Sequence, residues 1–176
     1  MANEITAENA LSMLHTLLLP TLKMESRVTK SVLDAVPADK AEHRPDAISK
    51  SAIELVRHIA LADLRFVDMV LTGTFNADMA LPQNLKTPAE IASWYSQSCE
   101  RDFQALSKLS GEQLAKVLDF RGRLQMPAIS FLMLGLRHTI HHRGQLSSYL
   151  RCMDAKVPAI YGDSYDSEQA KKAAQA

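Results

Sequence analysis

Hydrophobic residues recur every three to four positions through most of the chain, which is the spacing of one face of an α-helix. Four long stretches show this spacing, at about residues 6–36, 51–71, 87–109 and 127–153. Pro20 lies inside the first stretch, so we expect it either to kink that helix or to mark a later start. Four long helices joined by short to moderate connections predict an all-α fold, a four-helix bundle.

Polar residues and prolines mark where these helices begin. Ser51 is followed three residues later by a glutamate, a pattern in which the two side chains satisfy backbone N–H groups at a helix N-terminus. Thr87 precedes Pro88, and proline is favoured at the first position of a helix. Residues 117–125 alternate loosely between apolar and polar, which predicts either a small hairpin or an extended loop.

Length and composition indicate one domain. The chain has 176 residues, of which 47% are hydrophobic and 23% charged, with only six glycines, a composition typical of a helical globular protein. A chain of this length buries about 70% of the surface of its unfolded form, so it needs no metal or disulfide to hold it together. We expect a single domain over residues 1–176, with its core at about 7–155 and a tail at 156–176. Cys99 and Cys152 imply no disulfide framework.

The balance of charge argues against several classes of partner. The chain has 20 basic and 20 acidic residues, so its net charge offers no general attraction for nucleic acid or for an anionic membrane surface. No apolar run reaches the roughly 18 residues that would predict a membrane span. The first residues lack the basic region and apolar run of a signal peptide. We therefore expect a cytoplasmic protein without a nucleic-acid or membrane partner.

The candidate chemistry lies on the last long helix. Winding this helix places three histidines on its mostly apolar side, which we expect to face the core: His138, His141 and His142. A buried imidazole with an unpaired nitrogen costs roughly 1–3 kcal/mol, so either hydrogen bonds or a metal ion must offset that cost. His138 and His142 are four residues apart and can bind one metal ion together, although His141 could compete for this role. The alternative is a histidine-rich helix whose rings are hydrogen-bonded in the core. Arg143 falls on the other side, where we expect a surface, interface or ion-pair residue.

Three acidic residues lie within or beside the apolar stripes of the other helices. Asp63 is inside the apolar arc of the second helix, and because buried carboxylates rarely stand unpaired we expect a partner for it. We interpret Glu25 as a solvated edge residue, with a buried partner of a histidine or a cation as the alternative. Asp102 is either an edge carboxylate or a residue that orients a metal ligand.

Three segments read together resemble a known family. They are Ser-Ala-Ile-Glu-Leu-Val-Arg-His-Ile-Ala at 51–60, His-Thr-Ile-His-His-Arg-Gly-Gln-Leu-Ser-Ser-Tyr-Leu-Arg at 138–151, and Lys-Val-Pro-Ala-Ile-Tyr-Gly at 156–162. The chain resembles the DinB/YfiT-like family of metal-dependent helical bundles over about residues 10–163. The most specific part is His-x-x-x-His-Arg-x-Gln-Leu with a further histidine about 80 residues upstream.

The resemblance implies a four-helix bundle, often a homodimer, that binds one divalent metal ion through His58, His138 and His142, and not His141. Imidazole ligands suit zinc or nickel. Three protein ligands leave one coordination position open for water or substrate, as in catalytic sites. Because characterised relatives use low-molecular-weight thiols, the resemblance implies a metal-dependent enzyme, a thiol S-transferase or a hydrolase, with a small-molecule substrate.

Other interpretations stay open at the level of the sequence. A metal-binding, stress-related dimer without turnover is the alternative to an enzyme, since no second obvious catalytic group accompanies the histidines. Gln145 and Tyr149 lie one and two turns beyond His142, where they could orient substrate or a ligand's second nitrogen, and packing is a further role for Tyr149. Gly135 could leave room near a metal ion or could permit close packing of two helices.

Overall fold

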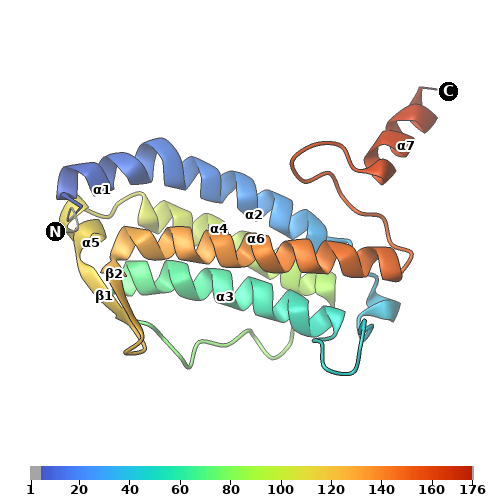
Figure 1. Cartoon of the computed structure of the whole chain (residues 1–176), viewed down its shortest axis with the longest axis horizontal. Coiled ribbons are helices and arrows are strands. Elements are labelled where there is room, and N and C mark those ends of the chain that lie inside the picture. Colours follow the sequence, from blue (N-terminus) through green and yellow to red (C-terminus); the bar gives the residue numbers. More distant parts are fainter. Residues whose placement is uncertain (1–4, 176) are drawn as a thin grey trace.

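Four long helical elements lie side by side in the computed structural model, which describes residues 5–175 (Figure 1). They are a continuous first element made of α1 (Ala7–Met13), the π-helical turn η1 (Leu14–Leu18) and α2 (Leu19–Asp34), followed by α3 (Ala52–Thr72), α4 (Pro88–Leu106) and α6 (Ala128–Cys152). This is the all-α arrangement that the hydrophobic spacing predicts.

The first element changes its winding immediately before Pro20. In η1 the Leu19 N–H donates to the carbonyl of Leu14, five residues back instead of the usual four. Pro20 has no N–H to donate, and its ring crowds the carbonyl four residues earlier, so a regular α-helix is disfavoured at this point. A single wider turn accommodates the proline, and the α-helix resumes as α2. The sequence predicts a kink or a later helix start at Pro20, and the structure shows a π-helical turn immediately before it.

The helix starts follow the side chains that the sequence singles out. Ser51 accepts from the backbone N–H of Glu54, whose carboxylate accepts in turn from the backbone N–H of Ser51. Thr87 caps α4 in the same reciprocal way, and Pro88 is the first residue of that helix. These two capping boxes satisfy backbone donors that the helix itself leaves unpaired.

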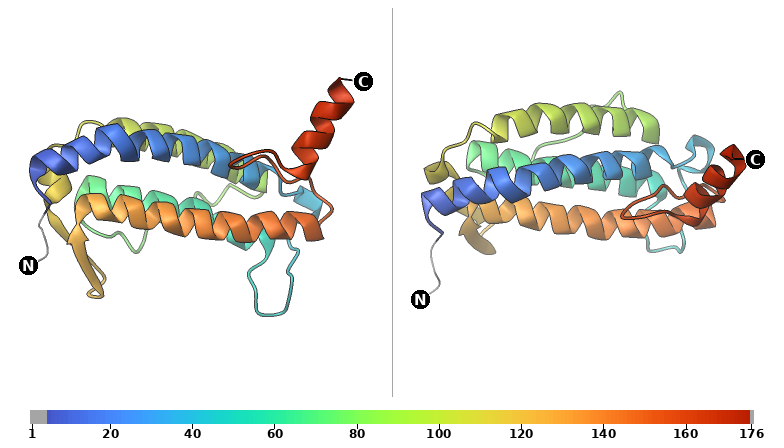
Figure 2. Two further views of the ribbon diagram at one scale, coloured as in Figure 1. Left: turned by 45° about the horizontal axis from the view of Figure 1, so that its top comes forward. Right: turned by 90° about the horizontal axis from the view of Figure 1, so that it is seen from above.

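Short elements lie in three places along the chain: between α4 and α6, after α2, and after α6. Between α4 and α6 lie α5 (Gly111–Ala115) and an antiparallel hairpin of β1 (Val117–Phe120) and β2 (Leu124–Pro127), which confirms the hairpin alternative for this segment. The 3₁₀ turn η2 (Ala38–Lys40) follows α2, and the helix α7 (Tyr165–Ala174) ends the described chain. Figure 2 shows α7 projecting away from the four long elements, and it contributes no buried residue.

Among the long helices, α6 packs against α3 on one side and α2 on the other. Toward α3 the two backbones come close at Gly135, where an added Cβ would lie 2.8 Å from the Cβ of Phe66 and 3.1 Å from its Cγ. Phe66 is bulky and its Cβ is fixed to the α3 backbone, so the helices could not approach this closely with a larger residue at position 135. The structure therefore assigns Gly135 a role in helix packing.

The contact of α6 with α2 contains a buried ion pair, which the sequence analysis gave for each of its two residues only as one of several alternatives. Arg143 is 1% exposed and Glu25 is 5% exposed. The Arg143 guanidinium lies 2.6 Å from a carboxylate oxygen of Glu25, donates to the hydroxyl of Thr29 and donates to the hydroxyl of Tyr161. The solvated-edge interpretation of Glu25 is thus wrong, and its alternative as the partner of a cation is correct. Of the three roles expected for Arg143, the structure confirms the ion pair, and the residue is buried and not at the surface.

The other two acidic residues also find polar partners. Asp63 is buried and accepts a hydrogen bond of 2.6 Å from the hydroxyl of Tyr95, which confirms that this carboxyl has a partner. Burial raises the pKa of Asp63 above its ordinary value. The carboxylate of Asp102 forms a salt bridge of 2.8 Å with the side chain of the neighbouring Arg101. Its partner is therefore a cation and not a histidine of the proposed metal site.

Two further expectations concern the cysteines and membranes. Both cysteines are free, with Cys99 buried in α4 and Cys152 exposed at the last residue of α6. Within residues 5–175, no helix combines the length and the apolar character that crossing a bilayer requires.

Two glycines of α6 allow a matched test of the close contact with α3. Alanine is favoured over glycine in a helix by up to about 1 kcal/mol, and overpacking a core costs about 1–3 kcal/mol. Gly144 is exposed, and a Cβ added there meets no atom within 4 Å. In urea denaturation, we expect Gly144→Ala to raise the free energy of unfolding and Gly135→Ala to lower it. Equal gains in both variants would contradict the close contact between Gly135 and Phe66.

Candidate metal centre

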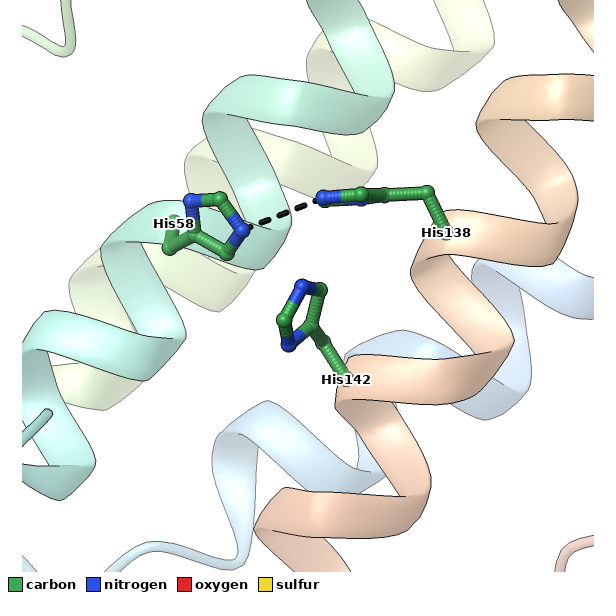
Figure 3. Close-up of side chains that lie close together, drawn as sticks. All are labelled: His58, His138 and His142. Atoms are coloured by element: carbon green, nitrogen blue, oxygen red, sulfur yellow. Dashed lines mark hydrogen bonds between the residues drawn. The ribbon is translucent and has the colours of Figure 1, made fainter. Parts of the chain in front are cut away.

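Three histidine side chains from two helices converge between α3 and α6. His58 comes from the N-terminal half of α3, and His138 and His142 come from successive turns of α6 (Figure 3). One ring nitrogen from each lies within 4.8 Å of the others, and the group contains no carboxylate or thiol. Among the described residues, this is the one group of three or more histidine, cysteine or acidic side chains that lie this close together.

The three rings are arranged around a common point. The Nε2 atoms of His58 and His138 are 3.1 Å apart. The ring of His142 lies edge-on to both, with centroids 4.5 Å from each. Around a tetrahedral ion with bonds of about 2.0–2.1 Å, ligand nitrogens lie about 3.4 Å apart. The 3.1 Å between His58 and His138 is close to this separation, and a ring nitrogen of His142 lies within 4.8 Å of both.

The electrostatics of the group keep at least two imidazoles neutral at physiological pH. Burial, followed by the neighbouring His142, His58 and His141, lowers the pKa of His138 to about 4. Burial also lowers the pKa of His58, with smaller contributions from the charges of His142, Lys50 and Arg65. A neutral imidazole has a lone pair that can bind a metal ion, whereas a protonated one has none. These two rings are therefore in the state that a ligand requires.

The second nitrogens of the rings differ in what they contact. The Nδ1 of His142 lies 3.1 Å from the side-chain oxygen of Gln145. The Nδ1 of His138 is buried and has no hydrogen-bond partner within the described part of the chain. An ion on the Nε2 of His138 would leave this Nδ1 unchanged, so the fit to a metal rests on the convergence of the three rings and on the donor set. An all-nitrogen donor set fits a divalent ion such as zinc or nickel.

Two arginines of α3 donate to the backbone of the loop that follows this helix. Arg57 donates to the carbonyl of Leu85, and Arg65 donates to the carbonyl of Ala77. Sequence reasoning missed these roles because both residues resemble ordinary solvated charges on the edge of a helix. The available signal was their place on α3, one residue before and seven residues after His58. The charge of Arg65, together with that of Lys50, makes the surroundings of His58 electropositive.

The sequence expectation is only partly met for the histidines of α6. His138 and His142 are half-buried and face α3, whereas His141 is exposed. The expectation that all three histidines face inward is therefore wrong for His141. One residue of an α-helix turns the side chain by about 100°, so His141 and His142 cannot both face the same neighbouring helix squarely. The ring of His141 stays 4.8 Å from that of His142 without joining the group.

Comparison with known proteins gives the same fold. A sequence model of the DinB family matches residues 7–173. The protein YjoA of Bacillus subtilis strain 168 is 27% identical over 128 residues, which cover 72% of this chain and 82% of YjoA. YrdA of the same organism is 38% identical over 73 residues, covering 41% of this chain and 43% of YrdA.

Solved structures of DinB-like proteins superpose on most of the chain. The crystal structure of YjoA gives a TM-score of 0.70 at 23% identity and covers 83% of this chain and 99% of that one. A DinB-like protein from Bacillus cereus ATCC 10987 gives a TM-score of 0.69 at 23% identity, covering 82% of this chain and 95% of that one. The mostly helical fold is shared with these proteins.

The lowered pKa of His138 predicts how acid affects the metal-free protein. An unfolded chain protonates this imidazole near its ordinary pKa of 6.5, whereas the folded protein does so only at about 4. Between these values the unfolded state binds more protons, so the free energy of unfolding should fall as the pH falls. His138→Gln, which cannot titrate, should reduce this decrease in urea denaturation series between about pH 4 and 7. The exposed control His15→Gln, whose residue is not among the groups that shift His138, should retain the wild-type slope, and equal slopes in all three proteins would contradict the assignment.

Proposed function

This chain belongs to the DinB family. We propose that it binds one divalent metal ion through His58, His138 and His142 and that it is a metal-dependent enzyme. The observation that carries the proposal is the convergence of three imidazole nitrogens from α3 and α6. Imidazoles are neutral ligands, so the charge of the ion would stay uncompensated, and three protein ligands leave a coordination position for a small molecule. Zinc and nickel are the ions that best suit these ligands.

The chain's own residues would prepare the site for an anionic small molecule. The three histidines are only half-buried, so solute can reach the space between α3 and α6. Lys50 and Arg65 lie near enough to His58 to influence its pKa, and the same positive charges would favour an anion at the site. A divalent ion held there supplies Lewis acidity, which lowers the pKa of a thiol or a water molecule.

The nucleophile of the proposed reaction comes from a bound molecule and not from a side chain. Burial raises the pKa of the Cys99 thiol well above its ordinary value, so Cys99 stays protonated. Cys152 lies ten residues beyond His142, about 15 Å along α6. A low-molecular-weight thiol or water is the remaining source, which corresponds to a thiol S-transferase or a hydrolase acting on a small-molecule substrate.

A metal-binding dimer without turnover is the second candidate function. The observation that favours it is the composition of the histidine group, which contains no carboxylate that could act as a general base. Both candidates include a homodimer in the cytoplasm, and both require the same three ligands. They differ in whether the open coordination position is used to turn over a substrate.

Metal content tests the ligand assignment that both candidates share. We expect protein purified without a histidine tag to bind about one equivalent of zinc or nickel, measured by elemental analysis after dialysis. His58→Ala and His142→Ala should each lose this stoichiometric metal because two imidazoles rarely retain an ion. His141→Ala removes an exposed histidine next to His142 and should keep the wild-type metal content. Wild-type protein without metal, or His58→Ala with full metal content, would overturn the proposal.

Turnover separates the enzyme from the non-catalytic dimer. We expect the metal-loaded protein to catalyse thiol transfer or hydrolysis when a panel of low-molecular-weight thiols is combined with electrophilic substrates and followed by mass spectrometry. His142→Ala should lose this activity, and chelation followed by readdition of zinc or nickel should remove and restore it. Full metal content without turnover of any thiol or ester in the panel would favour the non-catalytic candidate.

A further inference from the structure

We propose that Gln145 is a positioning residue that holds His142 in the tautomer able to bind a metal ion. The inference rests on the proposed function, because it assigns a residue that supports one of the three proposed ligands. Gln145 lies three residues after His142, so both side chains are on the same face of α6. The role follows from the hydrogen bonds at the two ends of the Gln145 amide.

The first bond fixes which nitrogen of His142 carries the hydrogen. The side-chain oxygen of Gln145 lies 3.1 Å from the Nδ1 of His142. An amide oxygen only accepts, so this Nδ1 must donate, and a neutral imidazole that carries its hydrogen on Nδ1 has its free lone pair on Nε2. The Nε2 of His142 is the nitrogen that faces the other two rings in Figure 3. The bond therefore turns the lone pair of His142 toward His58 and His138.

The second bond holds the amide itself in this orientation. The side-chain nitrogen of Gln145 donates to the hydroxyl of Tyr149, one turn further along α6, at 3.4 Å. Tyr149 is 5% exposed, and its ring packs edge-on against His43 with centroids 6.2 Å apart. If the amide were rotated by half a turn, its NH₂ group would donate to Nδ1 and leave the hydrogen on Nε2, where it would block the metal-facing lone pair. Packing around Tyr149 thus supports the tautomer through Gln145.

The same bonds decide between the roles that Gln145 could have. Each end of this amide has a partner, His142 at the oxygen and Tyr149 at the nitrogen, and these two bonds together favour the positioning role over the orientation of a substrate. Gln145 therefore acts on the metal through His142.

The expected effect is on the affinity for metal. A hydrogen bond from the second nitrogen orients a ligating histidine and raises its basicity, and losing such a partner weakens metal binding about 10- to 100-fold. Gln145→Leu removes the acceptor at similar size. Gln145→Glu keeps an acceptor for Nδ1 and adds negative charge, so this variant should keep the affinity of the wild type for metal. Gln97→Leu is the matched control, because Gln97 is exposed on α4 and bonds only to Ser93.

The first experiment measures affinity on metal-free protein. Zinc is titrated in competition with a chromogenic chelator, and the free energy of unfolding of each metal-free variant is measured in parallel. We expect Gln145→Leu to bind about 10- to 100-fold more weakly than wild type, with Gln145→Glu at least as tight as wild type and Gln97→Leu unchanged. Wild-type affinity in Gln145→Leu, or equal weakening in Gln145→Leu and Gln145→Glu, would overturn the assignment.

The second experiment reads the tautomer without any metal. In protein labelled with ¹⁵N-histidine at pH 8, long-range ¹H–¹⁵N correlation spectra distinguish imidazoles with the hydrogen on Nδ1 from those with it on Nε2. We expect His142 to carry its hydrogen on Nδ1 in wild type and to shift toward the Nε2 form in Gln145→Leu. An unchanged tautomer in Gln145→Leu would overturn the positioning role. A protein that shows the expected tautomers but binds no zinc would instead overturn the proposed metal site.

Discussion

The close packing of α3 against α6 is the contact on which the histidine group depends. His58 belongs to one helix and His138 and His142 to the other, so the separation of the helices sets the distances between their ring nitrogens. Gly135 allows the backbones to approach at Phe66, less than one turn before His138. Because the side chains of a packed core move little, a small change in this contact would alter all three nitrogen positions together.

Local pattern predicted the local structure well and the long-range contacts poorly. The helices, the caps at Ser51 and Thr87 and the facing pair His138 and His142 all follow from spacing within one segment, which the sequence states directly. The contribution of His58 came only from resemblance to a family, since no local rule pairs a residue with another 80 positions away. The same limit explains why the loop contacts of α3 were missed.

The sequence did not identify the burial of Glu25 and Arg143, and the position of α6 explains why. A pattern of apolar residues identifies one buried side of a helix, whereas α6 is covered on two sides by α3 and α2. The second buried side, toward α2, carries the charged residue Arg143, so the pattern of apolar residues does not reveal it. Arg143 can be buried there because Glu25 lies 2.6 Å away and neutralises its charge. Two successive residues, His142 and Arg143, thus face different helices, and each is held by its own polar partner.

The ion pair between Arg143 and Glu25 also binds a residue from beyond the last long helix. Tyr161, which lies beyond the last long helix, accepts from Arg143 at 2.6 Å and donates to Glu25 at 3.1 Å, with its ring 5.3 Å from the guanidinium. A fragment that ended at residue 155 would lack Tyr161, so water could reach the charged groups of Arg143 and Glu25 that the phenol of Tyr161 now contacts. The residues up to Tyr161 therefore cover the interior, and a chain shortened to residue 155 would lose this cover while keeping all four long helical elements.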